Sequence, residues 1–111
     1  MNTLDINLLH SVRTVRAALP HMKDSGSGSV AIVSSISGWK PGPRAQYGAA
    51  KASEIFLASS LAWELAPHKI RVNTVCPGSI MFDGGGWDRY RENSPDSFAA
   101  FLERDLPEGR L

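Results

Sequence analysis

Hydrophobic residues recur every three or four positions over residues 5–22, which predicts an amphipathic helix. The recurring positions are Leu8, Leu9, Val12, Val15, Ala18 and Leu19. Asp5 suits the first turn, because a carboxylate is stabilised by the positive end of the helix dipole. Pro20 lies near the predicted end of the helix, and residues 23–28 form a polar, glycine-containing loop.

Two later segments predict β-strands. Residues 29–34 have an apolar centre that does not alternate with polar positions, which is typical of a strand covered on both faces in a parallel sheet. Residues 70–75 are a second strand candidate that ends before Pro77-Gly78. Between them, residues 45–66 predict a long helix that is apolar on more than one face and ends at Pro67. A strand, a crossover helix and a second strand predict a parallel βαβ unit.

The C-terminal part of the chain is less regular. Gly84 to Gly86 form a predicted flexible junction, and residues 87–92 and 95–104 predict two short helices. Ser94 is a candidate cap for the second of these helices, with Pro95 at its first position. We expect residues 81–104 to form a substrate lid.

Two covered strands are too few for a stable sheet, since three or more strands or good helix cover are usually needed. The prediction is therefore an α/β chain whose residues 1–111 form a single partial domain of a larger doubly wound parallel sheet.

Composition excludes several classes of function. The 111 residues carry a net charge of +1 without a basic cluster, so neither nucleic-acid binding nor binding to an anionic membrane has electrostatic support. No apolar run approaches the roughly 18 residues of a membrane span, and the N-terminus lacks the pattern of a signal peptide. We therefore expect a cytoplasmic protein. The single cysteine, Cys76, excludes an internal disulfide, and the histidines show no ligand spacing, so we expect no metal site.

Tyr47 and Lys51 are the candidate chemical pair. They lie four residues apart near the start of the helix predicted over residues 45–66, so both side chains can face one site. A nearby ammonium favours the phenolate form of tyrosine, which makes the pair a candidate proton donor or acceptor.

Four ordered motifs resemble the short-chain dehydrogenase/reductase family. They are Asp-Ile-Asn-Leu at 5–8, Ser-Ser-Ile-Ser-Gly at 34–38, Tyr-Gly-Ala-Ala-Lys at 47–51 and Arg-Val-Asn-Thr-Val-Cys-Pro-Gly at 71–78. The resemblance covers nearly the whole chain. It implies a Rossmann-like fold and hydride transfer between NAD or NADP and a carbonyl or secondary alcohol. The implied substrate is thus a small carbonyl or alcohol compound. The implied assembly is a homodimer or homotetramer that is paired through the helices at 5–22 and 45–66.

The resemblance also implies a role for each matching residue. Tyr47 corresponds to the catalytic tyrosine, Lys51 to the lysine that assists it and holds the cofactor ribose, and Asn7 to the asparagine that holds a relay water. The catalytic serine has two candidates. The distance to Gly38 selects Ser35, whereas the family's common distance to the tyrosine selects Ser34. We favour Ser35, because a one-residue shift at a strand end turns the side chain to the other face.

The resemblance also implies that the turn after the second strand contacts the nicotinamide. Pro77 and Gly78 match the family's motif, and backbone groups near Ile80 are expected to meet the carboxamide. Phe82 stands where the family often has threonine, a departure that affects one cofactor contact.

The N-terminal cofactor half of the family fold has no counterpart in this sequence. Residues 26–31 contain two glycines but precede a predicted strand and open no helix, so they fail the structural test for a phosphate loop. The choice between NAD and NADP therefore stays open. An alternative function follows from the same observation: a non-catalytic remnant that acts as an interaction module through its helix faces.

Overall fold

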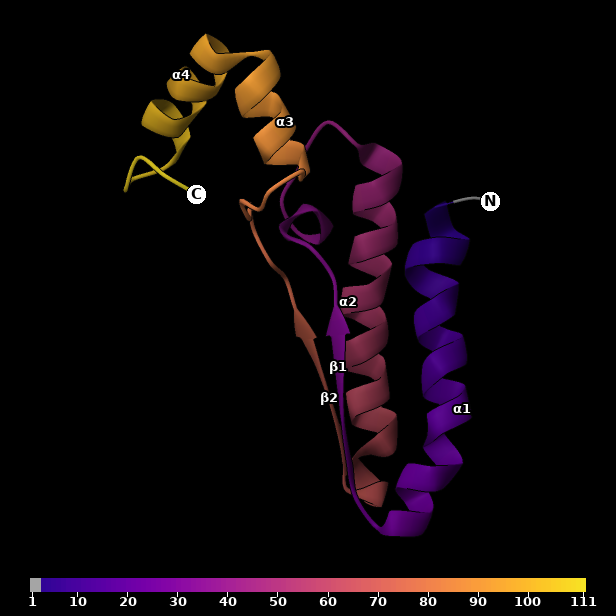
Figure 1. Ribbon diagram of the computed structural model, residues 1–111. Coiled ribbons are helices and arrows are strands. Elements are labelled where there is room, and N and C mark those ends of the chain that lie inside the picture. The colour runs from indigo at the N-terminus through magenta and orange to yellow at the C-terminus, as the bar shows by residue number, and fades with distance from the viewer. Residues whose placement is uncertain (1–2) are drawn as a thin grey trace. The chain divides into compact units, whose positions relative to one another are not determined.

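The computed structural model describes residues 3–111 and divides the chain into two compact units, Met1–Pro77 and Gly78–Leu111. Figure 1 shows the elements of both units. The expectation of a single partial domain stays a prediction. Within the described residues, no helix is both long and apolar enough to cross a membrane.

The first helix has two parts. A π-helical turn, η1 (Asp5–Leu9), leads directly into α1 (His10–Ser25). The helix thus runs three residues beyond the predicted end at residue 22, and Pro20 lies inside it. It ends at Gly26, which adopts a left-handed conformation with φ of 85° and donates its amide to the Lys23 carbonyl. Glycine adopts this conformation without steric cost, which explains the end of the helix.

The predicted βαβ unit is confirmed. Strand β1 (Gly28–Val33) pairs in parallel with β2 (Ile70–Val75), with Gly28 opposite Ile70 and Val33 opposite Val75. Helix α2 (Ala45–Leu65) connects them and ends in a 3₁₀ turn, Ala66–His68, that contains Pro67. A helical crossover is what a parallel pair requires.

The core lies between the sheet and the helices. Figure 1 shows α1 and α2 on the same side of the two strands. Five buried residues form the centre of this core: Ile32, Ala58, Leu65, Ile70 and Val72. Side chains of α1 pack against them. Close packing of these aliphatic side chains is the main stabilisation of the unit.

The prediction that both faces of β1 are covered is wrong for the residues that the structure describes. In both strands the side chains that point away from α2 are exposed, namely Ser29, Ala31, Val33, Arg71, Asn73 and Val75. The physical reason is the pleat of the strand, which sends alternate side chains to opposite faces, while α1 and α2 cover only one of them.

The second unit contains α3 (Gly86–Asn93) and α4 (Pro95–Asp105). Aromatic side chains pack between the two helices: the rings of Trp87 and Phe101 stack with centroids 4.8 Å apart, and Phe98 is buried. Ser94 makes no side-chain capping bond to α4, so the predicted cap is wrong, although Pro95 does begin the helix. The Ser94 backbone instead has φ of −145° and ψ of 65°, and its carbonyl accepts the Phe98 amide.

Glycines 84–86 form a turn that is held by Asp88 and Arg89. The Asp88 carboxylate accepts a hydrogen bond of 2.9 Å from the Gly84 amide, and Arg89 donates one of 2.7 Å to the Gly84 carbonyl. At the far end of α4, Arg104 donates to the Asp105 carboxylate, which raises the pKa of Arg104 above its usual value.

Candidate active site

The candidate site lies at the carboxyl ends of the parallel strands. Backbone pairing continues past both strands, because the Ser34 amide donates to the Val75 carbonyl at 2.8 Å and the Ile36 amide donates to the Pro77 carbonyl at 3.0 Å. Residues 34–38, which we call the serine loop, are thereby held beside the turn at Pro77. This edge of an α/β sheet is where such folds bind their ligands.

The two candidate serines face different surroundings. Ser34 is buried, and its hydroxyl donates to the Lys51 carbonyl at 2.7 Å, which ties the end of β1 to α2. Ser35 is half-buried, and its hydroxyl oxygen accepts the Ser37 amide at 3.1 Å. The Ser35 hydroxyl proton therefore stays available for a ligand, whereas that of Ser34 is already donated.

Tyr47 and Lys51 lie on one face of α2, as their spacing requires. The Lys51 ammonium is 5.8 Å from the centre of the Tyr47 ring. Lys51 is only 9% exposed, and its Nζ donates to the Val33 carbonyl at 3.2 Å. Nζ also forms an ion pair of 2.9 Å with Oε1 of Glu54. An ammonium has three protons, so these two contacts leave at least one donor for another group.

Two glycines bring the serine loop close to α2. A Cβ atom on Gly38 would lie 2.9 Å from the backbone carbon of Lys51, and one on Gly48 would lie 2.9 Å from the Ser37 carbonyl oxygen. Real Cβ atoms do not approach backbone atoms this closely, so both positions require glycine unless the backbone shifts. The glycines in the two motifs thus serve the contact between loop and helix.

Asn7 lies in the middle of the π-helical turn η1, and this turn packs against α2. Its side-chain amide donates to the Thr3 carbonyl at 3.0 Å. π-Helical turns are rare and occur frequently at functional sites. The structure therefore places Asn7 beside the helix that carries Tyr47 and Lys51.

The predicted nicotinamide contacts fall on both sides of the boundary between the units. Pro77 belongs to the first unit, where its carbonyl is bonded to the serine loop. Gly78 and Ile80 belong to the second unit, and both are exposed.

Sequence reasoning missed Glu54 and Ser11. Glu54 is only 1% exposed, and its Oε2 accepts a hydrogen bond of 2.9 Å from the buried Ser11 hydroxyl. Oε1 has no hydrogen-bond partner within the described part of the chain, and its close contact with Lys51 is an ion pair without hydrogen-bond alignment. The available signal was an acid three residues after Lys51, on the same helix face.

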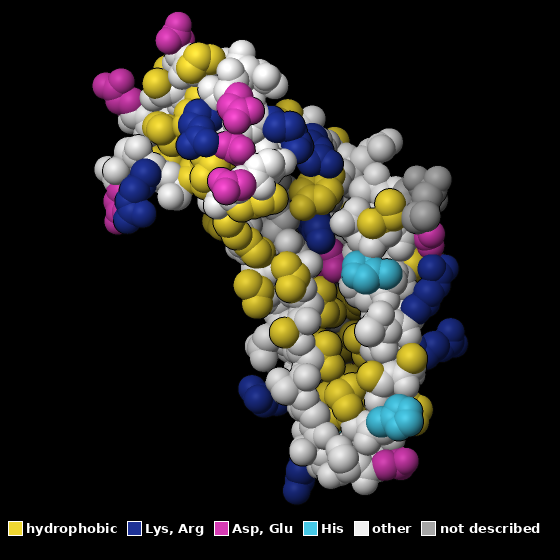
Figure 2. All heavy atoms as spheres, in the orientation of Figure 1, with side chains coloured by type: hydrophobic (Ala, Val, Ile, Leu, Met, Phe, Trp, Pro, Cys, Tyr) yellow, Lys and Arg dark blue, Asp and Glu magenta, His cyan; other side chains and the backbone are white. Residues whose placement is uncertain are grey.

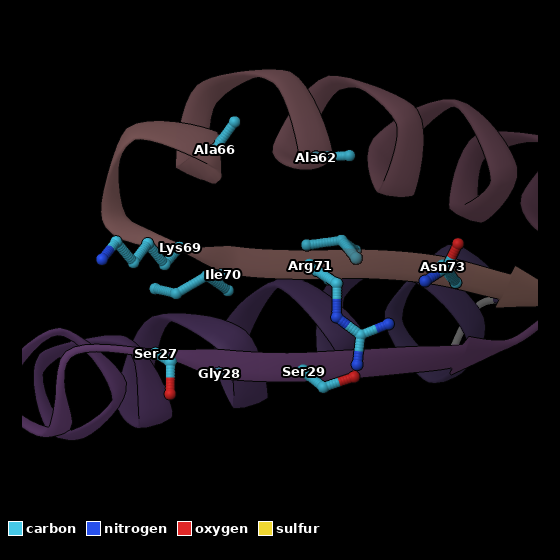
Figure 3. Close-up of a pocket in the computed structure, with 10 residues that line it drawn as sticks. Ser27, Gly28, Ser29, Ala62, Ala66, Lys69, Ile70, Arg71 and Asn73 are labelled. Atoms are coloured by element: carbon cyan, nitrogen blue, oxygen red, sulfur yellow. The ribbon is translucent and has the colours of Figure 1, made fainter.

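A hollow of about 440 Å³ opens beside Tyr47, lined by the loop of residues 37–44 and the start of α2. The Arg44 guanidinium lies 4.4 Å from the centre of the Tyr47 ring. A larger hollow of about 870 Å³ lies at the beginning of the strands, where Arg71 extends toward Ser29 (Figure 3). That hollow is at the opposite end of the strands from Ser35 and Pro77, so it is not the candidate site.

These features define a class: an α/β protein with a tyrosine, a buried lysine and a serine at the carboxyl ends of parallel strands. The family model of the short chain dehydrogenases matches residues 1–85. The chain belongs to this family.

Individual relatives agree with this assignment. The human "Dehydrogenase/reductase SDR family member 4" is 44% identical over 79 residues, which are 70% of this chain and 28% of that protein. "Isoepoxydon dehydrogenase patN" of Aspergillus clavatus is 36% identical over 93 residues, 82% of this chain and 36% of that protein. The chain thus spans about a third of the length of the curated relatives it matches.

Solved structures show the same fold. An oxidoreductase of the short chain dehydrogenase/reductase family from Burkholderia thailandensis superposes with a TM-score of 0.79 at 33% identity, over 89% of this chain and 38% of that chain. A putative short-chain alcohol dehydrogenase from Sinorhizobium meliloti has a TM-score of 0.79 at 29% identity over 95% of this chain. The predicted α/β, Rossmann-like fold class is thereby confirmed.

Proposed function

We propose that the chain carries the acid–base centre of an oxidoreductase that moves a hydride between NAD or NADP and a carbonyl or secondary alcohol. The observation that supports this most is the Lys51 ammonium, which is buried at the carboxyl end of β1 beside Tyr47, with at least one donor to spare. The family membership supports the oxidoreductase class and gives no support to the alternative of a non-catalytic interaction module.

Each residue has a distinct task in this proposal. Ser35 donates a hydrogen bond to the substrate oxygen, which aligns that oxygen with the Tyr47 hydroxyl. Tyr47 then gives a proton to the oxygen during reduction or accepts one during oxidation. Lys51 stabilises the phenolate form of Tyr47 by its charge. Asn7 holds the water that exchanges protons with the site.

The residues present fit one end of a nicotinamide cofactor. Tyr47 and the free Lys51 donor suit the hydroxyl groups of a ribose, and the backbone from Pro77 to Ile80 offers amide and carbonyl groups for a carboxamide. When bound, the cofactor supplies the hydride acceptor or donor. Residues 26–31 do not suit its phosphates, because Gly26 ends α1 and Gly28 begins β1, so that no helix starts there.

The lid and the assembly complete the proposal. Residues 81–104 are the proposed substrate lid, and aromatic rings pack between its helices α3 and α4. Subunits pair into a homodimer or homotetramer through α1 and α2, because α2 exposes Phe56 and Trp63 to 74% and 87%.

The experiment is a titration of the protein with NADH and with NADPH, followed by cofactor fluorescence, and then an absorbance assay with a panel of small ketones and aldehydes. We expect saturable binding of one of the two cofactors and oxidation of that cofactor by at least one carbonyl compound. Absence of binding for both cofactors would contradict the proposal.

A further inference from the structure

The hollow of about 440 Å³ beside Tyr47 carries two positive side chains and no negative one. Lys40 and Arg44 are the charged residues among those that line it. Both are exposed, and within residues 3–111 neither the Lys40 ammonium nor the Arg44 guanidinium has a hydrogen-bond or ion-pair partner. A concave surface with charges of one sign attracts ligand groups of the opposite sign. The hollow therefore favours an anionic group.

The hollow adjoins both residues that are proposed to meet the substrate oxygen. Tyr47 lines it directly. Ser37 lines it as well, and the Ser37 amide donates to the Ser35 hydroxyl oxygen at 3.1 Å. The Arg44 guanidinium lies 4.4 Å from the centre of the Tyr47 ring. Because the tyrosine hydroxyl is bonded to this ring, the guanidinium is only a few bond lengths from the proposed position of the substrate oxygen.

Backbone contacts hold both cationic residues in place. The Lys40 amide donates to the Ile36 carbonyl at 2.9 Å, and the Arg44 carbonyl accepts the Gly48 amide at 2.9 Å. Two of the three residues between Lys40 and Arg44 are prolines, whose rings fix the backbone φ angle. A site that is ordered before it binds loses less conformational freedom on binding. The two cations are thus presented by a restrained segment.

A carboxylate suits the chemistry of this pair of cations. The guanidinium of Arg44 is planar, and its N–H donors form a fork that matches the two oxygens of a carboxylate. Its contact with the Tyr47 ring is a cation–π contact, which orients the guanidinium. The Lys40 ammonium adds a second, compact charge from the other end of the restrained segment.

Two other hollows of the first unit differ in charge or in place. One of about 260 Å³ lies between α1 and β1, contains the Glu54 carboxylate and is lined mainly by hydrophobic side chains, which Figure 2 shows along this depression. The hollow of about 870 Å³ contains Lys69 and Arg71 and no acid, but it lies at the opposite end of the strands from Tyr47. It therefore provides a control for charge alone.

We propose that Lys40 and Arg44 select carbonyl substrates that carry a carboxylate a few bonds from the carbonyl carbon. This inference rests on the proposed function, because it adds a specificity site to the same reaction. The Arg44 guanidinium donates to both carboxylate oxygens, and the carbonyl oxygen then lies against Ser35 and Tyr47. The carboxylate takes no part in the reaction and is retained in the hydroxy acid that reduction forms.

Arg44 has a simpler alternative role, in which it acts only on the Tyr47 ring. The two roles differ in a measurable way. An arginine that acts on Tyr47 alone changes the turnover of an oxo acid and of its neutral amide by the same factor. An arginine that binds the carboxylate changes the turnover of the acid selectively. The ratio of kcat/KM for the acid to kcat/KM for its amide therefore reports the proposed contact.

The experiment compares 2-oxopentanoate and 3-oxopentanoate, each with its amide, as substrates of the protein with its cofactor. The two acids are isomers that differ only in the spacing between carbonyl and carboxylate. We expect at least one acid to exceed its amide in kcat/KM by about tenfold or more, because hydrogen bonds to a charged group contribute at least this factor. In Arg44→Gln this ratio should fall to about one, mainly through a higher KM. A wild-type protein that prefers neither acid over its amide would overturn the proposal.

Arg71→Gln is the matched control, because it removes the same charge from the hollow at the far end of the strands. It should leave the ratio at the wild-type value. Arg44→Lys keeps the charge but not the fork, so it should retain part of the preference. Lys40→Gln should lower the ratio less than Arg44→Gln does. An equal fall in Arg71→Gln would show an effect of net charge and would contradict the assignment to Arg44.

A binding measurement tests the site without turnover. The Nε–H signal of Arg44 in ¹H–¹⁵N spectra of the whole protein is followed while each of the two acids is added. We expect a saturable shift with at least one acid, none with its amide, and weaker binding at high salt. Absence of saturation with both acids would overturn the proposal. A protein that binds neither NADH nor NADPH contradicts the proposed function instead, while this titration still decides on the carboxylate site.

Discussion

At the scale of single residues, the site depends on which contacts leave a polar group available. Lys51 is fixed by the Val33 carbonyl and by Glu54, so its position does not depend on a ligand. Ser34 gives its proton to the Lys51 carbonyl, whereas Ser35 only accepts a bond from Ser37. The adjacent serines therefore have different tasks, one in holding the helix and one in meeting the substrate.

This difference predicts opposite effects of two alanine substitutions. Ser35→Ala should lower turnover by about 10²-fold, because the substrate oxygen loses a positioned donor. Its loss of stability should be no larger than that of Ser34→Ala, because the bond that it removes, to the Ser37 amide, is only partly buried. Ser34→Ala should cost about 1 kcal/mol of unfolding free energy through the lost hydrogen bond, with turnover less affected. Thermal unfolding and a turnover assay on both variants make the comparison, and the reverse pattern would assign catalysis to Ser34.

The sequence predicted the residue positions that follow from spacing. Tyr47 and Lys51 share a helix face because four residues make about one turn, and the structure brings them together. The contact between Glu54 and Ser11 could not be predicted, because the two residues are 43 positions apart in the chain and lie on different helices. Periodicity describes one element at a time and does not specify which side chains of two elements meet.

At the scale of elements, the loop after β1 and the helix α2 are in closer contact than ordinary side chains allow. Gly38 and Gly48 lie on the two sides of this contact. This close contact positions the serine loop against the first turns of α2, where Tyr47 lies. A change that separates these elements should affect stability and turnover together.

Gly38→Ala tests this contact. Its new Cβ would lie 2.9 Å from the Lys51 backbone, so the loop or helix must move, and we expect a loss of about 1–3 kcal/mol in unfolding free energy. Gly42→Ala is the matched control in the same loop, since its Cβ would meet no atom within 4 Å. We expect it to change stability by less than about 0.5 kcal/mol. Chemical denaturation measures both, and equal stabilities would contradict the close approach.

The element boundaries were predictable where turn residues mark them. The residues of β2 and the start of α2 were predicted at the observed positions, because Pro67, Pro77 and the loop before residue 45 limit them. The cover of the strands was not predictable. Val33 and Ala31 are hydrophobic yet exposed, and composition alone does not distinguish a covered face from an open one.

At the scale of the whole molecule, helix α2 serves two surfaces. One face buries Ala58 and Leu65 against the sheet, and another exposes Phe56 and Trp63. Large exposed aromatic side chains on one helix are typical of a surface that meets another protein. The proposed pairing of subunits through α1 and α2 would bury them.

The proposed assembly predicts the effect of a charge on this surface. Trp63→Glu and Phe56→Glu should shift the protein toward the monomer, because a carboxylate in an apolar interface is costly to desolvate. Trp39→Glu is the control, since Trp39 is similarly exposed at 66% but lies outside both helices. Sedimentation equilibrium gives the masses. An unchanged assembly in the α2 variants would place the interface elsewhere.

The central claim is that Tyr47 transfers the proton while the rest of the site binds the cofactor. The most direct test is Tyr47→Phe, which removes one hydroxyl and keeps the ring, measured in parallel for turnover and for cofactor binding by fluorescence. We expect turnover to fall by at least about 10²-fold, because the proton donor is lost. Cofactor binding should remain, because Lys51 is held by Val33 and Glu54 independently of Tyr47. Turnover near that of wild type would contradict the account.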